Sequence, residues 1–192
     1  MIVLACLLAA QTAAAPLPDN AYVRVARNAA PCASAAAGCG RRILVALGPV
    51  QVHAGSRTAT LARGEIMVFD PDESYSVDGA AYVEVAVKHG HPRATRPAGY
   101  EPPAKNATLY DGGELFVFEE RLAPGDTRPR HGHGQRVVIV VNETRLQQWQ
   151  DDGKEVFKNQ VPDDVHFNEP VAHRVKNVGP RPLRNIVIEF KP

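Results

Sequence analysis

The chain has 192 residues, of which 44% are hydrophobic, so it can bury a core as one domain or as two small ones. Lys and Arg together number 22 and Asp and Glu 21, which leaves a net charge of +1. This balance gives no long-range field that would gather nucleic acid or an anionic membrane surface. We therefore expect no nucleic-acid partner and a small molecule as the ligand.

An apolar run opens the chain from Met1 to Ala10 and gives way to small residues around Ala13 to Ala15. Such a run followed by small residues is typical of a secretory signal and its cleavage site, although no Lys or Arg precedes it here. We expect residues 1–15 to be a signal peptide and the mature protein to be secreted or periplasmic. The run is far shorter than the roughly 20 apolar residues that span a bilayer, and no later segment comes close, so we expect no membrane span.

Two cysteines, Cys32 and Cys39, would remain after removal of this leader. An oxidising compartment would allow them to form a disulfide. Two buried or unpaired thiols fit the sequence equally well, so the pattern leaves the pairing open.

Stretches rich in β-branched and apolar residues recur along the chain, and helical patterns are almost absent outside the leader. The run 39–47 aligns with 133–141, and 22–25 aligns with 116–119 at the same offset of 94 residues. An internal duplication explains both alignments most simply. The sequence therefore predicts an all-β chain made of two repeats.

A proline-rich stretch separates the two repeats, and its prolines cannot serve a central strand. We expect residues 19–90 to form the first repeat, 91–107 a linker, and 108–192 the second repeat. The stretch begins beside a second His-x-His pair, His89 and His91, which we interpret as part of a solvated linker because no third ligand accompanies it.

The second repeat contains a strong hairpin signal, Asp152-Gly153. An Asp-Gly pair between two strand-like runs favours a tight turn between antiparallel strands. The runs on either side, 144–150 and 155–161, are therefore expected to pair with each other.

Histidines cluster in the second repeat. His131 and His133 precede an apolar run, and residues two apart on a strand share a face, so both can point into a barrel. His173 stands at the start of a later strand-like run. Three imidazoles that converge on one interior suit a divalent transition metal such as Fe, Mn, Ni, Cu or Zn. We therefore predict a metal site formed by His131, His133 and His173.

These segments resemble the two motifs of the cupin superfamily. The first motif has a Gly, five residues, His-x-His and a Glu after three or four more, and the second has a Pro, a few residues, a His, three residues and an Asn. The matching residues are Gly125, His131 and His133 in the first, and Pro170, His173 and Asn177 in the second, where the Pro-to-His spacing is shorter by one or two residues. The resemblance implies two jelly-roll β-barrels in tandem, as in a bicupin, with little helix apart from the leader.

The first motif departs from the family at its glutamate, which would fall at Val137 or Val138. What remains is similar to cupins that bind iron through three histidines, such as the thiol dioxygenase branch, but only in the number of ligands. Gln135 is the nearest polar candidate on the same face and would orient a substrate or a bound water.

The same alignment places Ala37 and Cys39 at the His-x-His positions of the first repeat and Tyr75 at the third histidine. We therefore expect the first repeat to be degenerate, without metal binding. A degenerate repeat can still complete the packing of its neighbour.

Arginines flank the candidate ligands at Arg128, Arg130 and Arg136. A guanidinium can hold a carboxylate through two parallel hydrogen bonds, so an anionic substrate is conceivable, with Gln135 and Arg136 as substrate-binding candidates. The alternative is that these arginines are solvated and bind no substrate.

The catalytic residues are not evident from the sequence, since a general acid or base would have to come from Glu169, Tyr110, His166 or an unplaced residue. A metal-dependent cupin enzyme of the oxygenase or isomerase type is one hypothesis. A non-catalytic protein that binds a small ligand, or a structural protein without metal, is the alternative. The sequence leaves a homodimer open.

Overall fold

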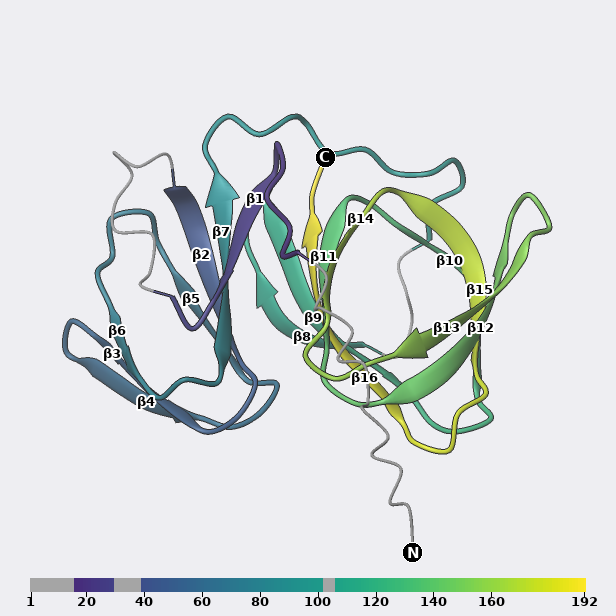
Figure 1. Ribbon diagram of the computed structural model, residues 1–192. Coiled ribbons are helices and arrows are strands. Elements are labelled where there is room, and N and C mark those ends of the chain that lie inside the picture. Colours follow the sequence, from purple (N-terminus) through teal and green to yellow (C-terminus); the bar gives the residue numbers. More distant parts are fainter. Residues whose placement is uncertain (1–15, 30–38, 102–105) are drawn as a thin grey trace, which may run out of the picture.

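Figure 1 shows the computed structural model, whose described residues are 16–29, 39–101 and 106–192. Within these ranges the chain has 16 strands and no helix, as the all-β prediction requires. The strands form two barrels that lie side by side, and the view looks into the second. Among the described residues no helix is long and apolar enough to cross a membrane. The predicted signal peptide lies outside the described residues.

The first unit, called here the N-terminal barrel, has two antiparallel sheets in the described part of the chain, with strand orders β1-β7-β2-β5 and β4-β3-β6. Its strands are β1 (Val23–Arg27), β2 (Cys39–Ala46), β3 (Val50–Ala54), β4 (Arg57–Leu61), β5 (Ile66–Phe69), β6 (Ser76–Asp78) and β7 (Tyr82–Lys88). Its interior is filled by an apolar cluster in which the rings of Phe69 and Tyr75 stack with centroids 3.7 Å apart.

The second unit, the C-terminal barrel, has sheets ordered β14-β11-β16-β9-β8 and β10-β15-β12-β13. Its strands are β8 (Asn106–Asp111), β9 (Leu115–Leu122), β10 (Thr127–His133), β11 (Arg136–Val140), β12 (Thr144–Gln150), β13 (Glu155–Gln160), β14 (Val165–Asn168), β15 (Val171–Asn177) and β16 (Leu183–Phe190). The predicted hairpin is confirmed, since β12 and β13 pair antiparallel around Gly153, whose φ of 81° suits glycine.

The two barrels repeat one strand order. The order β9-β16-β11-β14 in the second corresponds to β1-β7-β2-β5 in the first, strand for strand. Most of the aligned residues occupy equivalent places, since residues 42–46 of β2 align with 136–140, which form β11, and 23–25 of β1 align with 117–119 of β9. The first aligned residues differ, because 39 begins β2 whereas 133 ends β10. This correspondence supports the internal duplication.

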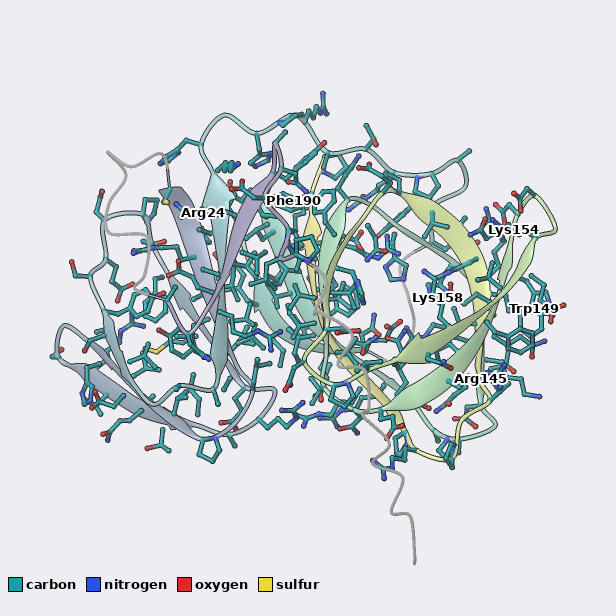
Figure 2. All side chains as sticks on the ribbon, viewed as in Figure 1. Arg24, Arg145, Trp149, Lys154, Lys158 and Phe190 are labelled. Carbon is teal, nitrogen blue, oxygen red and sulfur yellow. The ribbon has the colours of Figure 1, made fainter. Side chains whose placement is uncertain are left out.

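The largest apolar cluster lies between the two barrels, not inside either of them. It joins the sheet of β1, β2 and β7 to the sheet of β9, β11 and β16, and Phe190 marks this layer in Figure 2. Polar contacts close its edge, where Arg63 Nη2 donates to Val141 O at 3.0 Å and to Asp163 Oδ1 at 2.5 Å. Each large side chain buried in such a layer contributes about 1.5–3 kcal/mol. The N-terminal barrel thus supports the outer face of a sheet whose inner face lines the second barrel.

The stretch between the barrels packs against β10, which is an edge strand. Gly132 N donates to Glu101 O at 2.8 Å, so the linker satisfies part of the exposed strand edge. His91 differs from the solvated residue that we expected. Its ring lies 5.0 Å from that of Phe190 and 5.6 Å from that of Tyr22, because the linker folds back over the apolar layer.

Cys39 begins β2 and is disulfide-bonded. Cys32 and Ala37 lie outside the described residues.

Candidate metal site

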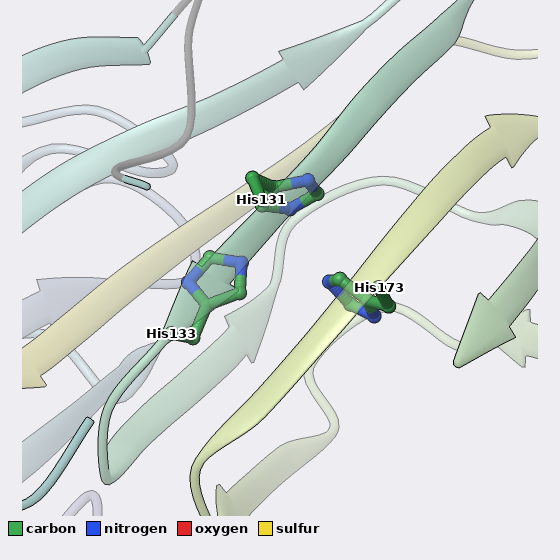
Figure 3. Close-up of side chains that lie close together, drawn as sticks. All are labelled: His131, His133 and His173. Carbon is green, nitrogen blue, oxygen red and sulfur yellow. The ribbon is translucent and has the colours of Figure 1, made fainter. Parts of the chain in front are cut away.

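The three histidines of the C-terminal barrel meet inside it. His131 and His133 lie on β10, and His173 lies on β15 directly opposite His131 in the strand register. One ring nitrogen of each lies within 4.8 Å of those of the other two, and all three residues are buried. Figure 3 shows the three rings gathered around one small space between the two strands.

A bulge sets the position of His131. The pairing of β10 with β15 shifts between Arg128 and His131, and Pro129, which has no N–H to offer a ladder, lies in this irregular stretch. The carbonyl oxygen of Pro129 lies 2.8 Å from His131 Nδ1. Because a carbonyl oxygen only accepts, Nδ1 carries the proton, and Nε2 of the neutral ring keeps its lone pair. This Nε2 is buried without a hydrogen-bond partner.

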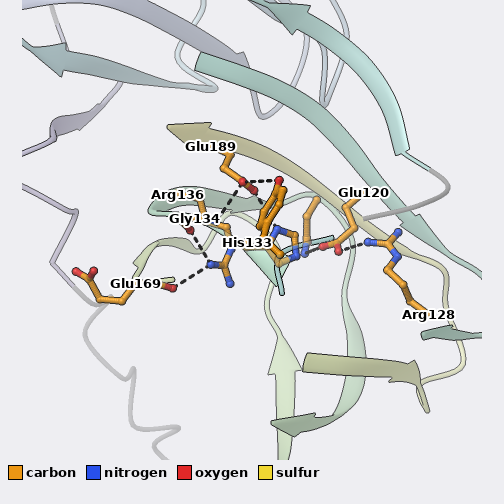
Figure 4. A network of polar contacts seen from close by, with 9 residues as sticks. Glu120, Arg128, His133, Gly134, Arg136, Glu169 and Glu189 are labelled. Carbon is orange, nitrogen blue, oxygen red and sulfur yellow. Dashed lines mark hydrogen bonds and ion pairs between the residues drawn. The ribbon is translucent and has the colours of Figure 1, made fainter. Parts of the chain in front are cut away.

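His133 is held by a buried carboxylate. Its Nδ1 lies 3.1 Å from Glu189 Oε2, and Glu189 Oε1 also accepts from Gly134 N and from the Tyr100 hydroxyl, each at 3.1 Å. Figure 4 shows this network, with Glu189 on β16 reaching the turn after β10. A carboxylate on Nδ1 fixes the tautomer that leaves Nε2 as the free ring nitrogen.

All three imidazoles are held neutral. Burial lowers the pKa of His131, and it lowers the pKa of His133 well below its usual value. Burial and then the two neighbouring histidines lower the pKa of His173 to about 2. Neutral imidazole is the form that binds a metal ion. His173 Nε2 is, like that of His131, buried without a partner, so the donor set fits a metal in its chemistry and its orphaned atoms.

A cavity of about 750 Å³ opens beside the histidines within the C-terminal barrel. Two of them, His133 and His173, line it. Its other walls combine apolar and polar side chains, among them Val138, Leu146, Val175, Val187, Glu120, Arg136, Lys158, Glu169 and Asn185. The volume suits a small organic molecule.

Glu120 is a cavity residue that the sequence reasoning missed. It lies on β9, with only 12% of its side chain exposed, and is paired with the buried guanidinium of Arg128. Burial alone would raise the pKa of Glu120, but the charge of Arg128 holds it below its usual value. The sequence feature that could have indicated Glu120 is the alternation of side chains along β9, which puts Phe118 and Glu120 on the same face.

The three arginines have different surroundings. Arg128 pairs with Glu120, and exposed Arg130 pairs with Asp151 at 2.5 Å. Arg136 is buried and lines the cavity, where its Nη1 donates to the carbonyl oxygens of Gly134 and Glu169, each at 3.1 Å. Only Arg136 of the three therefore faces the cavity without a carboxylate partner among the described residues.

Gln135 points elsewhere than we expected. Its Oε1 accepts from Thr95 N at 2.8 Å and its Nε2 donates to the Thr95 hydroxyl at 3.1 Å, so it fastens the linker. The reason is that β10 ends at His133 and the chain turns at Gly134, which interrupts the two-residue alternation. Val137 belongs to the layer between the barrels, whereas Val138 lines the cavity.

Two of the suggested acid or base candidates, Glu169 and His166, line the cavity. The third, Tyr110, is hydrogen-bonded to Arg41 of the N-terminal barrel and packs against the layer between the barrels. Asn177 of the second motif is fully buried, and its side chain bonds Thr144, Gly179 and main-chain oxygens. Its role in this chain is structural.

In the N-terminal barrel, the position that aligns with the third histidine is occupied by Tyr75, which contacts other polar side chains. The Tyr75 hydroxyl donates to Glu84, and the guanidinium of buried Arg42 lies 5.4 Å from the Tyr75 ring. Burial and the bond to Glu84 raise the pKa of Tyr75. Among the described residues, the only cluster of three or more potential metal ligands is the one in the C-terminal barrel.

Comparisons with known proteins show which solved structures this architecture resembles. No protein-family model matches the chain, and no curated protein matches it. Among solved structures, a cupin 2 conserved barrel domain protein from Leptotrichia buccalis covers 88% of this chain and 78% of its own, with 14% identity and a TM-score of 0.53.

AerE from Microcystis aeruginosa covers 79% of this chain and 78% of its own, with 12% identity and a TM-score of 0.54. A variant of oxalate decarboxylase from Bacillus subtilis covers 79% of this chain and 63% of its own, with 13% identity and a TM-score of 0.54. At these identities the likeness concerns the fold. The chain therefore has the cupin fold, built twice in tandem, with its histidine cluster in the second barrel.

Proposed function

We propose that the C-terminal barrel binds one divalent transition metal ion, Fe, Mn, Ni, Cu or Zn, through His131, His133 and His173, and acts on a small molecule in the adjoining cavity. The observation that carries the proposal is the pair of buried Nε2 atoms, on His131 and His173, that have no hydrogen-bond partner. A buried polar atom left without a partner costs roughly 1–3 kcal/mol, and a metal ion would relieve that cost for both atoms.

Other groups of the site also favour metal binding. Pro129 O accepts a hydrogen bond from His131 Nδ1–H and the Glu189 carboxylate accepts one from His133 Nδ1–H, which directs the other ring nitrogen of each histidine to the ion. A bound ion of this kind would supply Lewis acidity or redox chemistry at a position open to substrate. His133 and His173 line the cavity themselves, so a molecule held there would lie beside the ion.

The protein groups nearest to such a molecule would bind and orient it. Glu120, kept ionised by Arg128, would accept a hydrogen bond from a hydroxyl or amine of the substrate. Arg136 and Lys158 would hold an anionic group. Glu169 or His166 would exchange a proton with the substrate. One solved structure with this fold is described as an oxalate decarboxylase, an enzyme whose named substrate is an acid.

We also propose that the protein is exported. A disulfide at Cys39 supports this proposal, because such bonds persist in oxidising compartments.

Metal content tests the proposed function. The mature chain, purified without a histidine tag, is compared by inductively coupled plasma mass spectrometry with His131→Ala/His133→Ala and with a control, His53→Ala/His89→Ala, whose histidines lie near the surface of the N-terminal barrel. We expect near-stoichiometric metal in the wild type and control and little in the first variant. Equal trace metal in all three would reject the metal site and favour a binding or structural protein.

A further inference from the structure

Two cations face the cavity of the C-terminal barrel without a carboxylate partner among the described residues, Arg136 on β11 and Lys158 on β13. We infer that this cavity binds a small organic acid, whose carboxylate is held by Arg136 and Lys158. The inference deepens the proposed function and rests on it for the ion beside the acid. The anchor itself is formed by residues other than the histidines.

The surroundings of Arg136 call for an anion. The residue is only 7% exposed, and its Nη1 donates to two carbonyl oxygens, which carry no net charge. Among the described residues it forms no ion pair with a carboxylate, and Glu189 and Glu120 attract it only from a longer distance. A buried charge is costly unless it is paired, and a guanidinium remains charged at any physiological pH. Its remaining N–H groups are available to a carboxylate in the cavity.

Lys158 adds a second cation to the same cavity from the opposite sheet. In Figure 2 it lies at the opening of the C-terminal barrel, whereas Trp149 lies on the barrel's outer side. Partial desolvation of its otherwise exposed side chain, and then the charge of Arg136, lower the pKa of Lys158. Two like charges that influence each other across a cavity are both stabilised by an anion placed between them.

The acidic groups of the cavity leave this positive charge in excess. Glu120 is paired with Arg128, so these two charges balance. Glu169 Oε2 accepts from Gln135 at 3.4 Å and is the other carboxylate that lines the cavity. Among the residues that line the cavity, Arg136 and Lys158 therefore face one carboxylate outside an ion pair. Glu189 also attracts Arg136, but it does not line the cavity and is bonded to His133, Gly134 and Tyr100.

The cavity wall favours an organic acid over an inorganic anion. Seven apolar side chains line it, those of Val138, Leu146, Phe167, Pro170, Val171, Val175 and Val187. Its volume of about 750 Å³ exceeds what a sulfate or phosphate ion needs. Ligand cavities usually combine an apolar wall with a few polar groups that fix orientation. An acid with a short carbon chain matches both features.

The test is isothermal titration calorimetry with succinate, with its uncharged diamide, and with sulfate. The proteins are the wild type as purified, Arg136→Gln, Lys158→Gln, His131→Ala/His133→Ala, and a control, Arg130→Gln, which removes an exposed arginine from β10. We expect succinate to bind the wild type and the control, and both the diamide and sulfate to bind far more weakly. Each cavity variant should lose about tenfold or more in affinity, the worth of a charge-assisted hydrogen bond.

The histidine variant separates this inference from the proposed function. Succinate binding that survives there and is lost in Arg136→Gln and Lys158→Gln supports the anchor, whatever the metal content proves to be. If succinate binding is lost in the histidine variant and unchanged in both cation variants, the metal ion alone holds the acid. That result would contradict the inference that Arg136 and Lys158 bind the carboxylate. Equal affinity for sulfate and succinate would contradict the inference that the ligand is an organic acid. Lys158 is exposed, so its variant remains informative if Arg136→Gln fails to fold.

Discussion

His133 Nδ1 and Glu189 Oε2 lie 3.1 Å apart in the C-terminal barrel, and both residues are buried. They come from β10 and β16, which belong to different sheets, so the contact joins the two sheets at the histidine cluster. Bonds from Gly134 N and the Tyr100 hydroxyl fix the carboxylate from its other side. The orientation of the His133 ring is therefore set by the packed barrel before any ligand arrives.

Replacement of this carboxylate should weaken metal binding. In Glu189→Gln the neutral amide is a weaker acceptor for His133 Nδ1–H, and its NH₂ group would oppose either that N–H or Gly134 N–H. Loss of such a partner typically costs about 10- to 100-fold in metal affinity. Competition against a chromophoric chelator at neutral pH measures it, with the surface variant Glu155→Gln as control. Equal affinities in both variants and the wild type would mean that Glu189 does not position the ligand.

The buried histidines should make the metal-free protein sensitive to acid. Their pKa values in the folded chain lie below the usual 6.5, that of His173 at about 2. Below pH 6.5 the unfolded chain therefore binds protons that the folded chain does not, so the free energy of unfolding falls as the pH falls. The slope approaches about 1.4 kcal/mol per pH unit for each such histidine. The raised pKa of Glu189 acts in the opposite direction.

Chemical denaturation in a chelator between pH 7.5 and 5 tests this dependence. The variant His173→Gln removes one of the titrating groups, so its stability should fall less steeply with pH than that of the wild type. Parallel pH profiles for the two proteins would contradict a neutral, buried His173.

Local periodicity explains why part of the site could be predicted from the sequence. His131 and His133 share a face because side chains alternate along a strand, and the hairpin around Gly153 follows from its turn residues. Neither inference needs the rest of the fold. The third histidine came from the spacing of the cupin motifs, and the register of β10 against β15 explains why it lies opposite His131.

The missed features depend on contacts between distant segments. Glu119 and Glu120 are adjacent, and only the packing of β9 between two layers decides which one faces the cavity. Glu119 instead lies on the other face of the strand, paired with Arg121 and Arg184. Gln135 left the expected face because of a turn at Gly134 whose position the alternation did not reveal. Which of three arginines lacks a carboxylate partner likewise depends on long-range packing.

Gly132 should not tolerate a side chain. A Cβ there would lie 2.9 Å from Tyr100 Cδ2 and 3.1 Å from Pro97 Cγ, so Gly132→Ala must push the linker away from β10. Overpacking of this kind typically costs about 1–3 kcal/mol. Because Gly132 stands between His131 and His133, metal affinity should fall as well. Denaturant unfolding and chelator competition measure the two effects, with Gly113→Ala, where a Cβ would meet nothing within 4 Å, as the control. Tolerance of both substitutions alike would show that the linker is not packed on this strand.

The N-terminal barrel should contribute stability but no metal ligand. Tyr75, which the repeat alignment sets beside the third histidine, donates its hydroxyl proton to Glu84 and stacks on Phe69. In Tyr75→Phe the stack remains while Glu84 loses one donor, so the free energy of unfolding should fall by about 1–3 kcal/mol. Metal content should stay at the wild-type level, because the histidine cluster lies in the other barrel. Denaturant unfolding and mass spectrometry of the same samples measure both quantities. A variant as stable as the wild type but depleted of metal would reverse these assignments and place a ligand in the N-terminal barrel.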